Sequence, residues 1–135
     1  MYTPINVATG YLEAFTRSDP DEIAGFVAEG FRNEHMSELG SGCCGREEYR
    51  RRLPHFMATF TDRKYSVQDI VEMKRQATTE VVVKYQFQAT HADTDCRIEI
   101  PGTMWFSIAD GQILQRTDTW DSLTFLRQIG ADPTA

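Results

Sequence analysis

The ten residues from Val81 to Thr90 read VVVKYQFQAT, and their side chains alternate between two kinds. One set is apolar or aromatic: Val81, Val83, Tyr85, Phe87 and Ala89. The other set is mostly polar: Val82, Lys84, Gln86, Gln88 and Thr90. Because successive side chains of a β-strand point to opposite faces, this pattern predicts a strand with one buried face. The stretch therefore predicts a sheet against which the other elements pack.

Further strands are predicted on both sides of this one. They cover residues 31–36, 65–73, 97–108 and 113–120. Asp110–Gly111 separates the last two, and its tolerance of positive φ predicts a hairpin turn. Pro101–Gly102 interrupts the 97–108 run, which indicates an edge or a bulge. The polar segments 61–64 and 92–96 are predicted to be connections.

The first sixty residues show helical spacing instead. Helices are predicted over residues 5–15, from Asp19 to Gly30, and from Arg46 to about Phe60. The second helix has Asp19 as its cap, with Glu22 in position to complete a capping box. Pro54 is expected to kink the third helix. A short fourth helix is predicted to start at Asp121 or Ser122 and to stop at Gly130.

Helices that precede a run of antiparallel strands define an α+β fold. We expect a cone-shaped α+β barrel, in which the N-terminal helices pack on the concave face of a strongly curved antiparallel sheet. Such a cone leaves a pocket inside. The 135 residues match one domain, 1–135, with an ordered core of about residues 4–130.

Composition excludes several classes of function. Fourteen basic and twenty acidic residues give a formal charge of −6, which argues against nucleic acid as a partner. No apolar run approaches the roughly 18 residues of a membrane span, and no secretory signal is visible. Three cysteines, an odd number with two adjacent, favour a reduced, cytoplasmic setting. Without metal-ligand spacing or a glycine-rich phosphate loop, we expect no metal and no organic cofactor.

Several short motifs follow one another in a family-specific order. They are Glu34–His35, Gly45-Arg-Glu-Glu-Tyr49, Ala58-Thr-Phe-Thr-Asp62, Asp110-Gly-Gln-Ile113, Asp118-Thr-Trp-Asp121 and Leu126-Arg-Gln-Ile-Gly130. In this order the chain resembles the nuclear transport factor 2-like superfamily and, within it, the SnoaL-like polyketide cyclase branch. The resemblance implies a pocket for a small hydrophobic ligand and a homodimer. Members of the superfamily catalyse different reactions, so the resemblance leaves the reaction open.

Asp118 is the leading catalytic candidate. Strand alternation places it on one face with Leu114, Arg116 and Trp120, and the resemblance puts a general-base aspartate at this position. An apolar setting would raise the pKa of this carboxyl and prepare it to take a proton from a carbon acid. The alternative is a structural carboxylate paired with Arg116 or Arg97.

His35 is the second catalytic candidate, since alternation places it on one face with Phe31 and Asn33. It could donate a hydrogen bond to a substrate carbonyl, or it could be a core histidine. The expected substrate-binding residues are mostly aromatic, because an apolar lining is typical of ligand pockets. They are Tyr11, Phe15, Tyr49, Phe56, Tyr85, Trp105, Arg116 and Trp120.

The sequence thus leaves two kinds of function open. One is cofactor-independent acid–base catalysis on a hydrophobic, carbonyl-bearing molecule, of a cyclase, isomerase or hydrolase type that includes epoxide hydrolase and dehydratase chemistry. The resemblance to limonene epoxide hydrolase implies an Asp-Arg-Asp arrangement that activates water. Arg116 and Asp118 could supply a part of it, but a second aspartate is not evident in the sequence. The alternative is a ligand-binding or dimeric assembly module of the same fold without turnover.

Overall fold

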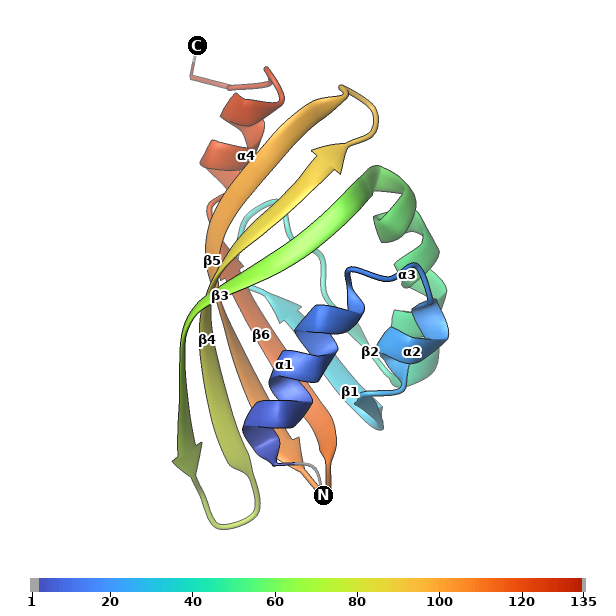
Figure 1. The fold of residues 1–135 in the computed structure, drawn as a ribbon, viewed down its shortest axis with the longest axis vertical. Coiled ribbons are helices and arrows are strands. Elements are labelled where there is room, and N and C mark those ends of the chain that lie inside the picture. The colour runs from blue at the N-terminus through green and yellow to red at the C-terminus, as the bar shows by residue number, and fades with distance from the viewer. Residues whose placement is uncertain (1–2, 135) are drawn as a thin grey trace.

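The computed structural model describes residues 3–134, and Figure 1 shows how its elements follow one another. Its helices are α1 (Pro4–Ala14), α2 (Pro20–Ala24), α3 (Arg46–Thr59) and α4 (Ser122–Gln128). Its strands are β1 (Val27–His35), β2 (Cys43–Cys44), β3 (Phe60–Lys74), β4 (Thr79–His91), β5 (Cys96–Ala109) and β6 (Gln112–Trp120). The predicted α+β class is confirmed.

The six strands form one sheet in the order β2-β1-β6-β5-β4-β3. All neighbouring pairs are antiparallel except β1 and β6, which run parallel. The prediction of a purely antiparallel sheet is therefore wrong for this pair. A long stretch of chain separates β1 from β6, so no tight turn forces them to be antiparallel. Their register aligns Asn33 with Arg116 and His35 with Asp118.

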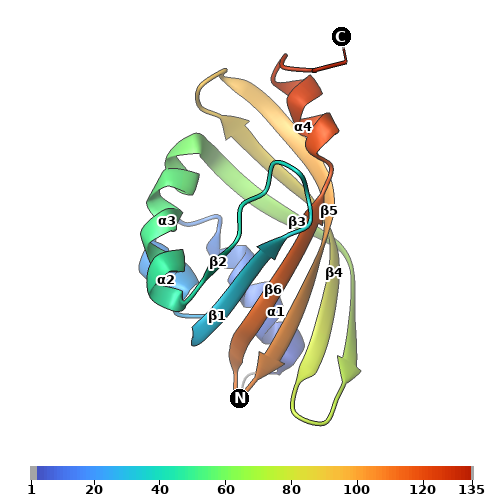
Figure 2. The ribbon, with the colours of Figure 1, turned by 180° about the vertical axis from the view of Figure 1, so that it is seen from behind.

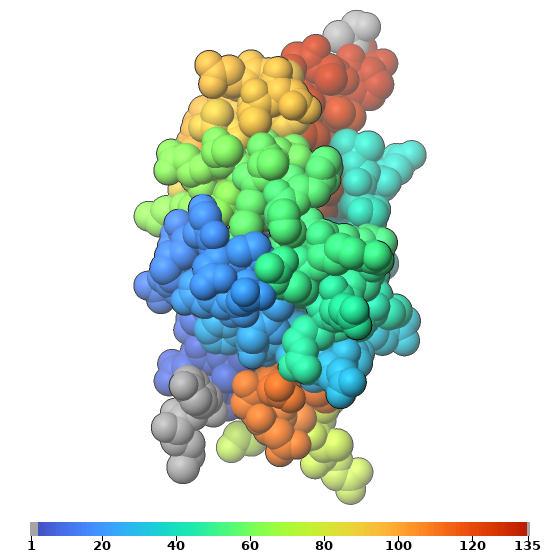
Figure 3. Space-filling model, turned by 90° about the vertical axis from the view of Figure 1, so that its right-hand side faces the viewer, coloured from blue at the N-terminus to red at the C-terminus, as the bar shows by residue number. Residues whose placement is uncertain are grey.

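Three helices cover one face of the sheet. Figure 1 shows α1 in front of the strands and α3 beside them, while Figure 2 shows β4, β5 and β6 from behind with no helix over them. Figure 3 shows the helical side of the molecule, where α1, α2 and α3 lie together on the surface. The core between helices and sheet contains large, fully buried side chains, among them Tyr11, Phe15, Phe31 and Phe106.

The second helix is shorter than predicted. Asp19 caps α2 by accepting hydrogen bonds from two backbone N–H groups, whereas Glu22 binds an arginine instead of completing a capping box. The chain then enters β1 at Val27, whose strand partner is Ile113. Residues 27–35 run as a strand, and the predicted helix through Gly30 is therefore wrong.

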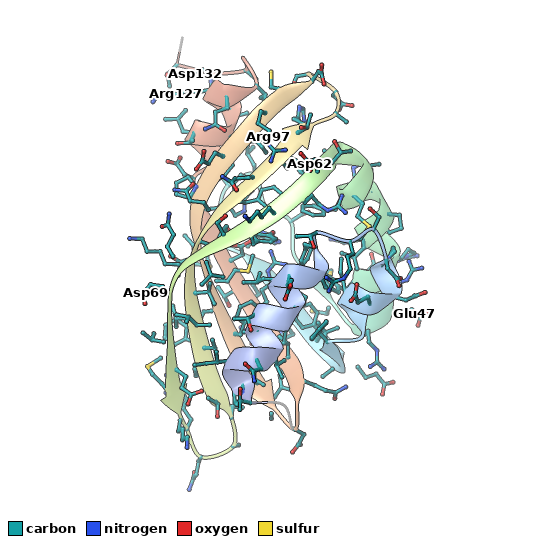
Figure 4. All side chains as sticks on the ribbon, in the orientation of Figure 1. Glu47, Asp62, Asp69, Arg97, Arg127 and Asp132 are labelled. Carbon is teal, nitrogen blue, oxygen red and sulfur yellow. The ribbon has the colours of Figure 1, made fainter. Side chains whose placement is uncertain are left out.

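The predicted turn at residues 61–64 lies inside β3. The register of β3 against β4 shifts there, and Asp62 has a positive φ of 50°, so a bulge replaces the turn. Arg97 of β5 donates to the carboxylate of Asp62 across 3.1 Å, and Figure 4 shows these two side chains near each other. Arg63 points inward and is buried.

The expected edge at Pro101–Gly102 is present, whereas the alternative of a bulge is not. Strand β5 pairs with β4 without a register shift, and β6 ends at Trp120, opposite Gly102. Beyond that point β5 has a free edge, and α4 lies along this edge. The side-chain amide of Gln128 accepts from the N–H of Glu99 at 2.7 Å and donates to its carbonyl at 2.9 Å.

Candidate active site

A cavity of about 810 Å³ lies between α3, the loop after β1 and the inner face of the sheet. Its wall is mainly apolar: Phe15, Tyr49, Leu53, Phe56, Phe60, Tyr65, Tyr85, Phe87, Ile98, Ile100, Trp120 and Phe125. Four largely buried polar side chains also line it: Asn33, His35, Arg116 and Asp118. An apolar hollow with a few convergent polar groups is the usual form of a small-molecule site.

Asp118 lies on β6 and is only 3% exposed. Its Oδ1 accepts a hydrogen bond from the Tyr85 hydroxyl at 2.6 Å, and its Oδ2 accepts one from Nη2 of Arg116 at 2.8 Å. The expected apolar setting beside Leu114 is therefore wrong. A bulge shifts the register of β6, so Ile113 is fully buried in place of Leu114, and a guanidinium and a phenol surround the carboxylate instead.

Tyr85 reaches Asp118 by crossing over β5. Its strand partner on β5 is Gly102, and a methyl group at that glycine would lie 2.3 Å from the Tyr85 hydroxyl oxygen. Only hydrogen at this position leaves room for the ring to pass. Burial, together with the charge of Asp118, raises the pKa of Tyr85 well above its ordinary value. The phenol is therefore protonated and acts as a donor.

Arg116 connects the carboxylate to the helical layer. Its Nη1 donates to the Tyr11 hydroxyl at 2.7 Å, and that hydroxyl is hydrogen-bonded to the hydroxyl of Tyr49. The guanidinium also lies 6.0 Å from the ring centre of Phe15. Burial opposes its charge, but Tyr11 and Asp118 outweigh this effect and hold the pKa of Arg116 above its ordinary range.

His35 lies beside Asp118 on the neighbouring strand. Burial, and then the positive charge of Arg116, lower the pKa of His35 to about 4, although Asp118 acts in the opposite direction. The ring is therefore neutral at pH 7. Its Nδ1 accepts a hydrogen bond from the indole N–H of Trp120 at 3.2 Å and lies 3.9 Å from Oδ2 of Asp118. An accepting Nδ1 assigns the ring proton to Nε2.

Eight of the ten residues chosen from the sequence line this one cavity: His35, Asp118, Phe15, Tyr49, Phe56, Tyr85, Arg116 and Trp120. Tyr11 does not line it, because it lies behind Arg116 as a hydrogen-bond partner. The expectation that Trp105 binds the substrate is wrong. It is 40% exposed on the opposite face of the sheet, where its indole N–H donates to Glu80. The buried neighbours Met104 and Phe106 carry the alternation that places Trp105 outside.

Sequence reasoning missed Asn33 as a site residue. It is buried in β1 and lines the cavity next to Arg116. The available signal was its position between Phe31 and His35 in the alternation of β1. It carried little weight, because one asparagine in a short strand does not reveal which face covers a cavity.

Over residues 3–134, no cluster of three or more His, Cys, Asp or Glu side chains is arranged to hold a metal ion. None of the helices within this range is both long and apolar enough to cross a membrane.

Residues 8–116 match the family model of the SnoaL-like domain, and the chain belongs to this family, within the nuclear transport factor 2-like superfamily. No curated protein matches its sequence.

Solved structures share the fold at low sequence identity. A protein of Catenulispora acidiphila with a ketosteroid isomerase-like fold, in complex with trimethylamine, has a TM-score of 0.81 and 15% identity, over 96% of this chain and 95% of that one. IdmH of Streptomyces antibioticus, a proposed polyketide cyclase, has a TM-score of 0.78 and 22% identity, over 96% and 99%. An LEH-like epoxide hydrolase of M. tuberculosis has a TM-score of 0.75 and 15% identity, over 97% and 92%.

Proposed function

We propose that this SnoaL-like domain is a cofactor-independent acid–base enzyme of the cyclase or isomerase type, acting on a hydrophobic compound with a carbonyl group. Asp118 takes a proton from the carbon next to the carbonyl and returns it, while His35 donates a hydrogen bond to the carbonyl oxygen. One observation carries this proposal: a buried carboxylate and a neutral imidazole lie side by side in an aromatic-lined cavity.

The surroundings of Asp118 suit a positioned base. A carboxylate offers about four lone-pair positions, and Tyr85 and Arg116 each engage one of them. The remaining positions leave room for a substrate proton. Because two donors hold the group in one orientation, a bound substrate meets the base at a defined angle, as efficient proton transfer requires.

The neutral state of His35 suits its proposed role. A ring with a pKa of about 4 keeps its Nε2 proton at pH 7 and donates it in a hydrogen bond rather than transferring it. An enolate that forms in the cavity concentrates charge on oxygen, and a fixed N–H donor stabilises that charge more than it stabilises the ketone. Trp120 fixes this donor by binding the other ring nitrogen.

A second candidate is ligand binding without turnover. Both oxygens of Asp118 already have protein partners, and Arg116 links them to Tyr11 and Tyr49. Such a network supports a structural carboxylate as well as a catalytic one. The same experiment separates the two candidates, because only a base exchanges substrate protons with solvent.

The test is catalysed exchange of α-protons for deuterium. The probe is 2-tetralone, a hydrophobic bicyclic ketone with acidic α-protons, and exchange in D2O is followed by proton NMR against a protein-free blank. We expect the wild-type protein to accelerate exchange. Asp118→Asn keeps the shape and removes the base, so it should lose at least about 100-fold of that acceleration.

Asp93→Asn is the matched control, because Asp93 is exposed in the turn between β4 and β5. This variant should exchange the probe at the wild-type rate. Wild-type exchange by Asp118→Asn would contradict the assignment of the base. Binding of 2-tetralone without accelerated exchange in either protein would favour the binding module.

We further propose that the protein forms a homodimer through the uncovered face of the sheet. An outer-face patch on β3, β4 and β5 consists of Val71, Met73, Val82 and Trp105, and Val71 and Trp105 are 52% and 40% exposed. The indole N–H of Trp105 donates a hydrogen bond to the Glu80 carboxylate, which fixes the orientation of the ring. Contiguous apolar patches that are exposed on a protein surface often mark sites where another protein binds.

A further inference from the structure

Two arginines of α3 lie at the mouth of the cavity. Arg51 and Arg52 both line it, and their side chains are 77% and 47% exposed. Arg116 and Asp118 line the same cavity but are buried. A lining side chain that also meets solvent lies at the opening, whereas a buried one lies deeper. The cavity therefore has a cationic mouth and a paired, buried floor.

The charge of the lining is opposite to that of the whole chain. Among residues 3–134, the charged side chains that line the cavity, apart from two histidines, are Arg51, Arg52, Arg116 and Asp118. Arg116 and Asp118 pair with each other at 2.8 Å, which leaves the two mouth arginines in excess. The chain as a whole has a formal charge of −6. A cleft lined by charge of one sign attracts ligands of the other sign.

One carboxylate of the chain, that of Glu48, serves both mouth arginines. Nε of Arg52 donates to its Oε1 at 2.9 Å, and Arg51 forms an ion pair with its Oε2. Nη1 of Arg52 donates to the carbonyl of Gly42 at 2.9 Å, which holds this guanidinium between α3 and the loop after β1. Two positive charges that share one negative charge leave one positive charge over. Because ion pairs between exposed side chains are weak, a ligand can compete for these donors.

We infer that the ligand carries a carboxylate, which Arg51 and Arg52 bind at the mouth while the apolar part of the ligand fills the cavity. The planar guanidinium presents its N–H groups as a fork that matches the two oxygens of a carboxylate. One excess positive charge also matches a carboxylate better than a phosphate monoester, whose charge is about −1.5 to −2.

The inference narrows the proposed substrate class to hydrophobic carbonyl compounds that also carry a carboxylic acid group. It rests on the proposed function only for the carbonyl, because the carboxylate site is tested by binding alone.

The binding test compares 2-naphthoate with 2-naphthamide, which have nearly the same shape and differ in charge. Dissociation constants are measured by isothermal titration calorimetry at pH 7, where the acid is ionised. At an ionic strength of about 10 mM, we expect the wild-type protein to bind 2-naphthoate about 10-fold more tightly than the amide. At about 1 M salt, screening should reduce this preference to about threefold or less.

The variant with Arg51→Gln and Arg52→Gln should bind the two ligands equally within about twofold and should bind 2-naphthamide as the wild type does. The matched control combines Arg32→Gln and Arg50→Gln. It removes the same charge from two residues that have acidic partners of their own and do not line the cavity, so it should keep the wild-type preference.

A second measurement removes the competing carboxylate instead of the arginines. Glu48→Gln leaves both guanidiniums without their shared partner. This variant should bind 2-naphthoate about threefold more tightly than the wild type, with 2-naphthamide unchanged. Because it keeps both arginines and the contact of Arg52 with Gly42, it does not depend on whether the double arginine variant folds.

Equal binding of the two ligands by the wild type would overturn the inference, as would a preference for 2-naphthoate that survives loss of both arginines. Equal weakening of both ligands in that variant would also overturn it, because the arginines would then shape the cavity without binding the carboxylate. These outcomes do not depend on turnover. If 2-tetralone exchange fails while the arginine-dependent preference is observed, the proposed catalysis falls and the carboxylate site stands.

Discussion

Gly102 controls the candidate site without contributing a side chain to it. Tyr85 crosses β5 at this residue to reach Asp118, and a Cβ there would approach its hydroxyl oxygen to 2.3 Å and its Cζ to 2.4 Å. The backbone carbonyl of Thr119 would lie at 2.9 Å. The glycine is required by the passage of a neighbouring ring, because its own φ is not in the left-handed region.

Gly102→Ala should therefore displace Tyr85 and break its bond to Asp118. We expect a loss of about 1–3 kcal/mol in unfolding free energy, measured by urea denaturation, and a loss of 2-tetralone exchange. Tyr85→Ala removes the ring that the methyl group would meet. In that background Gly102→Ala should cost much less, and only the contact with Thr119 would remain. An equal cost in both backgrounds would contradict the proposed crossing.

His35 should make stability depend on pH between about 4 and 6.5. Its pKa is about 4 in the folded protein and about 6.5 in an unfolded chain, so the unfolded state binds more protons in this window. Stability from this group is complete above pH 6.5 and is lost as the pH falls to 4. The full effect is on the order of 3 kcal/mol.

His35→Gln keeps a polar side chain and cannot titrate in this range. Its unfolding free energy, measured in urea at pH 7 and at pH 4.5, should fall by less than that of the wild type. The carboxylates of the chain titrate in both proteins and cancel in the comparison. Identical pH dependence in the two proteins would show that the ring is not buried as a neutral base.

At the scale of elements, Arg63 joins three segments that bound the cavity. It extends inward from the bulge of β3 and donates to the backbone carbonyls of Phe15, Arg17, Met57 and Phe60 at 2.7–3.3 Å. These carbonyls lie at or just beyond the C-terminal ends of α1 and α3. The last carbonyls of a helix have no hydrogen-bond donor within the helix itself. One buried guanidinium thus ties both helices to the sheet.

Arg63→Met keeps most of the aliphatic stem and removes every donor. We expect a loss of about 2–4 kcal/mol in unfolding free energy, because several buried carbonyls lose a charged partner. Hydrogen exchange should also accelerate at the C-terminal ends of α1 and α3. Lys64→Met, at the exposed neighbouring position, is the control and should leave both measurements unchanged. Equal stability of Arg63→Met and wild type would refute this role.

At the scale of the whole molecule, the uncovered sheet face predicts the assembly state. Multi-angle light scattering at micromolar concentration should give twice the 15.4 kDa of one chain. Val71→Glu places a charge in the outer-face patch and should shift the mass to that of a monomer. Leu123→Glu, at an exposed position on α4, should remain dimeric. A wild-type mass near 15.4 kDa would contradict the proposed dimer.

Much of the fold could be read along the chain because its signals are local. The alternation in β4 follows from backbone geometry alone, as does the Asp110–Gly111 hairpin, whose two residues have φ values of 52° and 73°. The same alternation, applied to residues 116–120, places Arg116 and Asp118 on the inner face of β6. It failed at Leu114, because a bulge leaves no distinct mark in the sequence.

The α+β class, the family and the inward face of most strands could be predicted from the sequence alone. Tertiary structure alone decided that β1 runs parallel to β6, which sets Asn33 beside Arg116 and His35 beside Asp118. It also decided that Asp118 is surrounded by donors rather than by apolar walls. Sequence periodicity indicates on which face of its own helix or strand each residue lies. The partners of a buried side chain come from segments far away in the chain, and their register is set only when the sheet and helices pack.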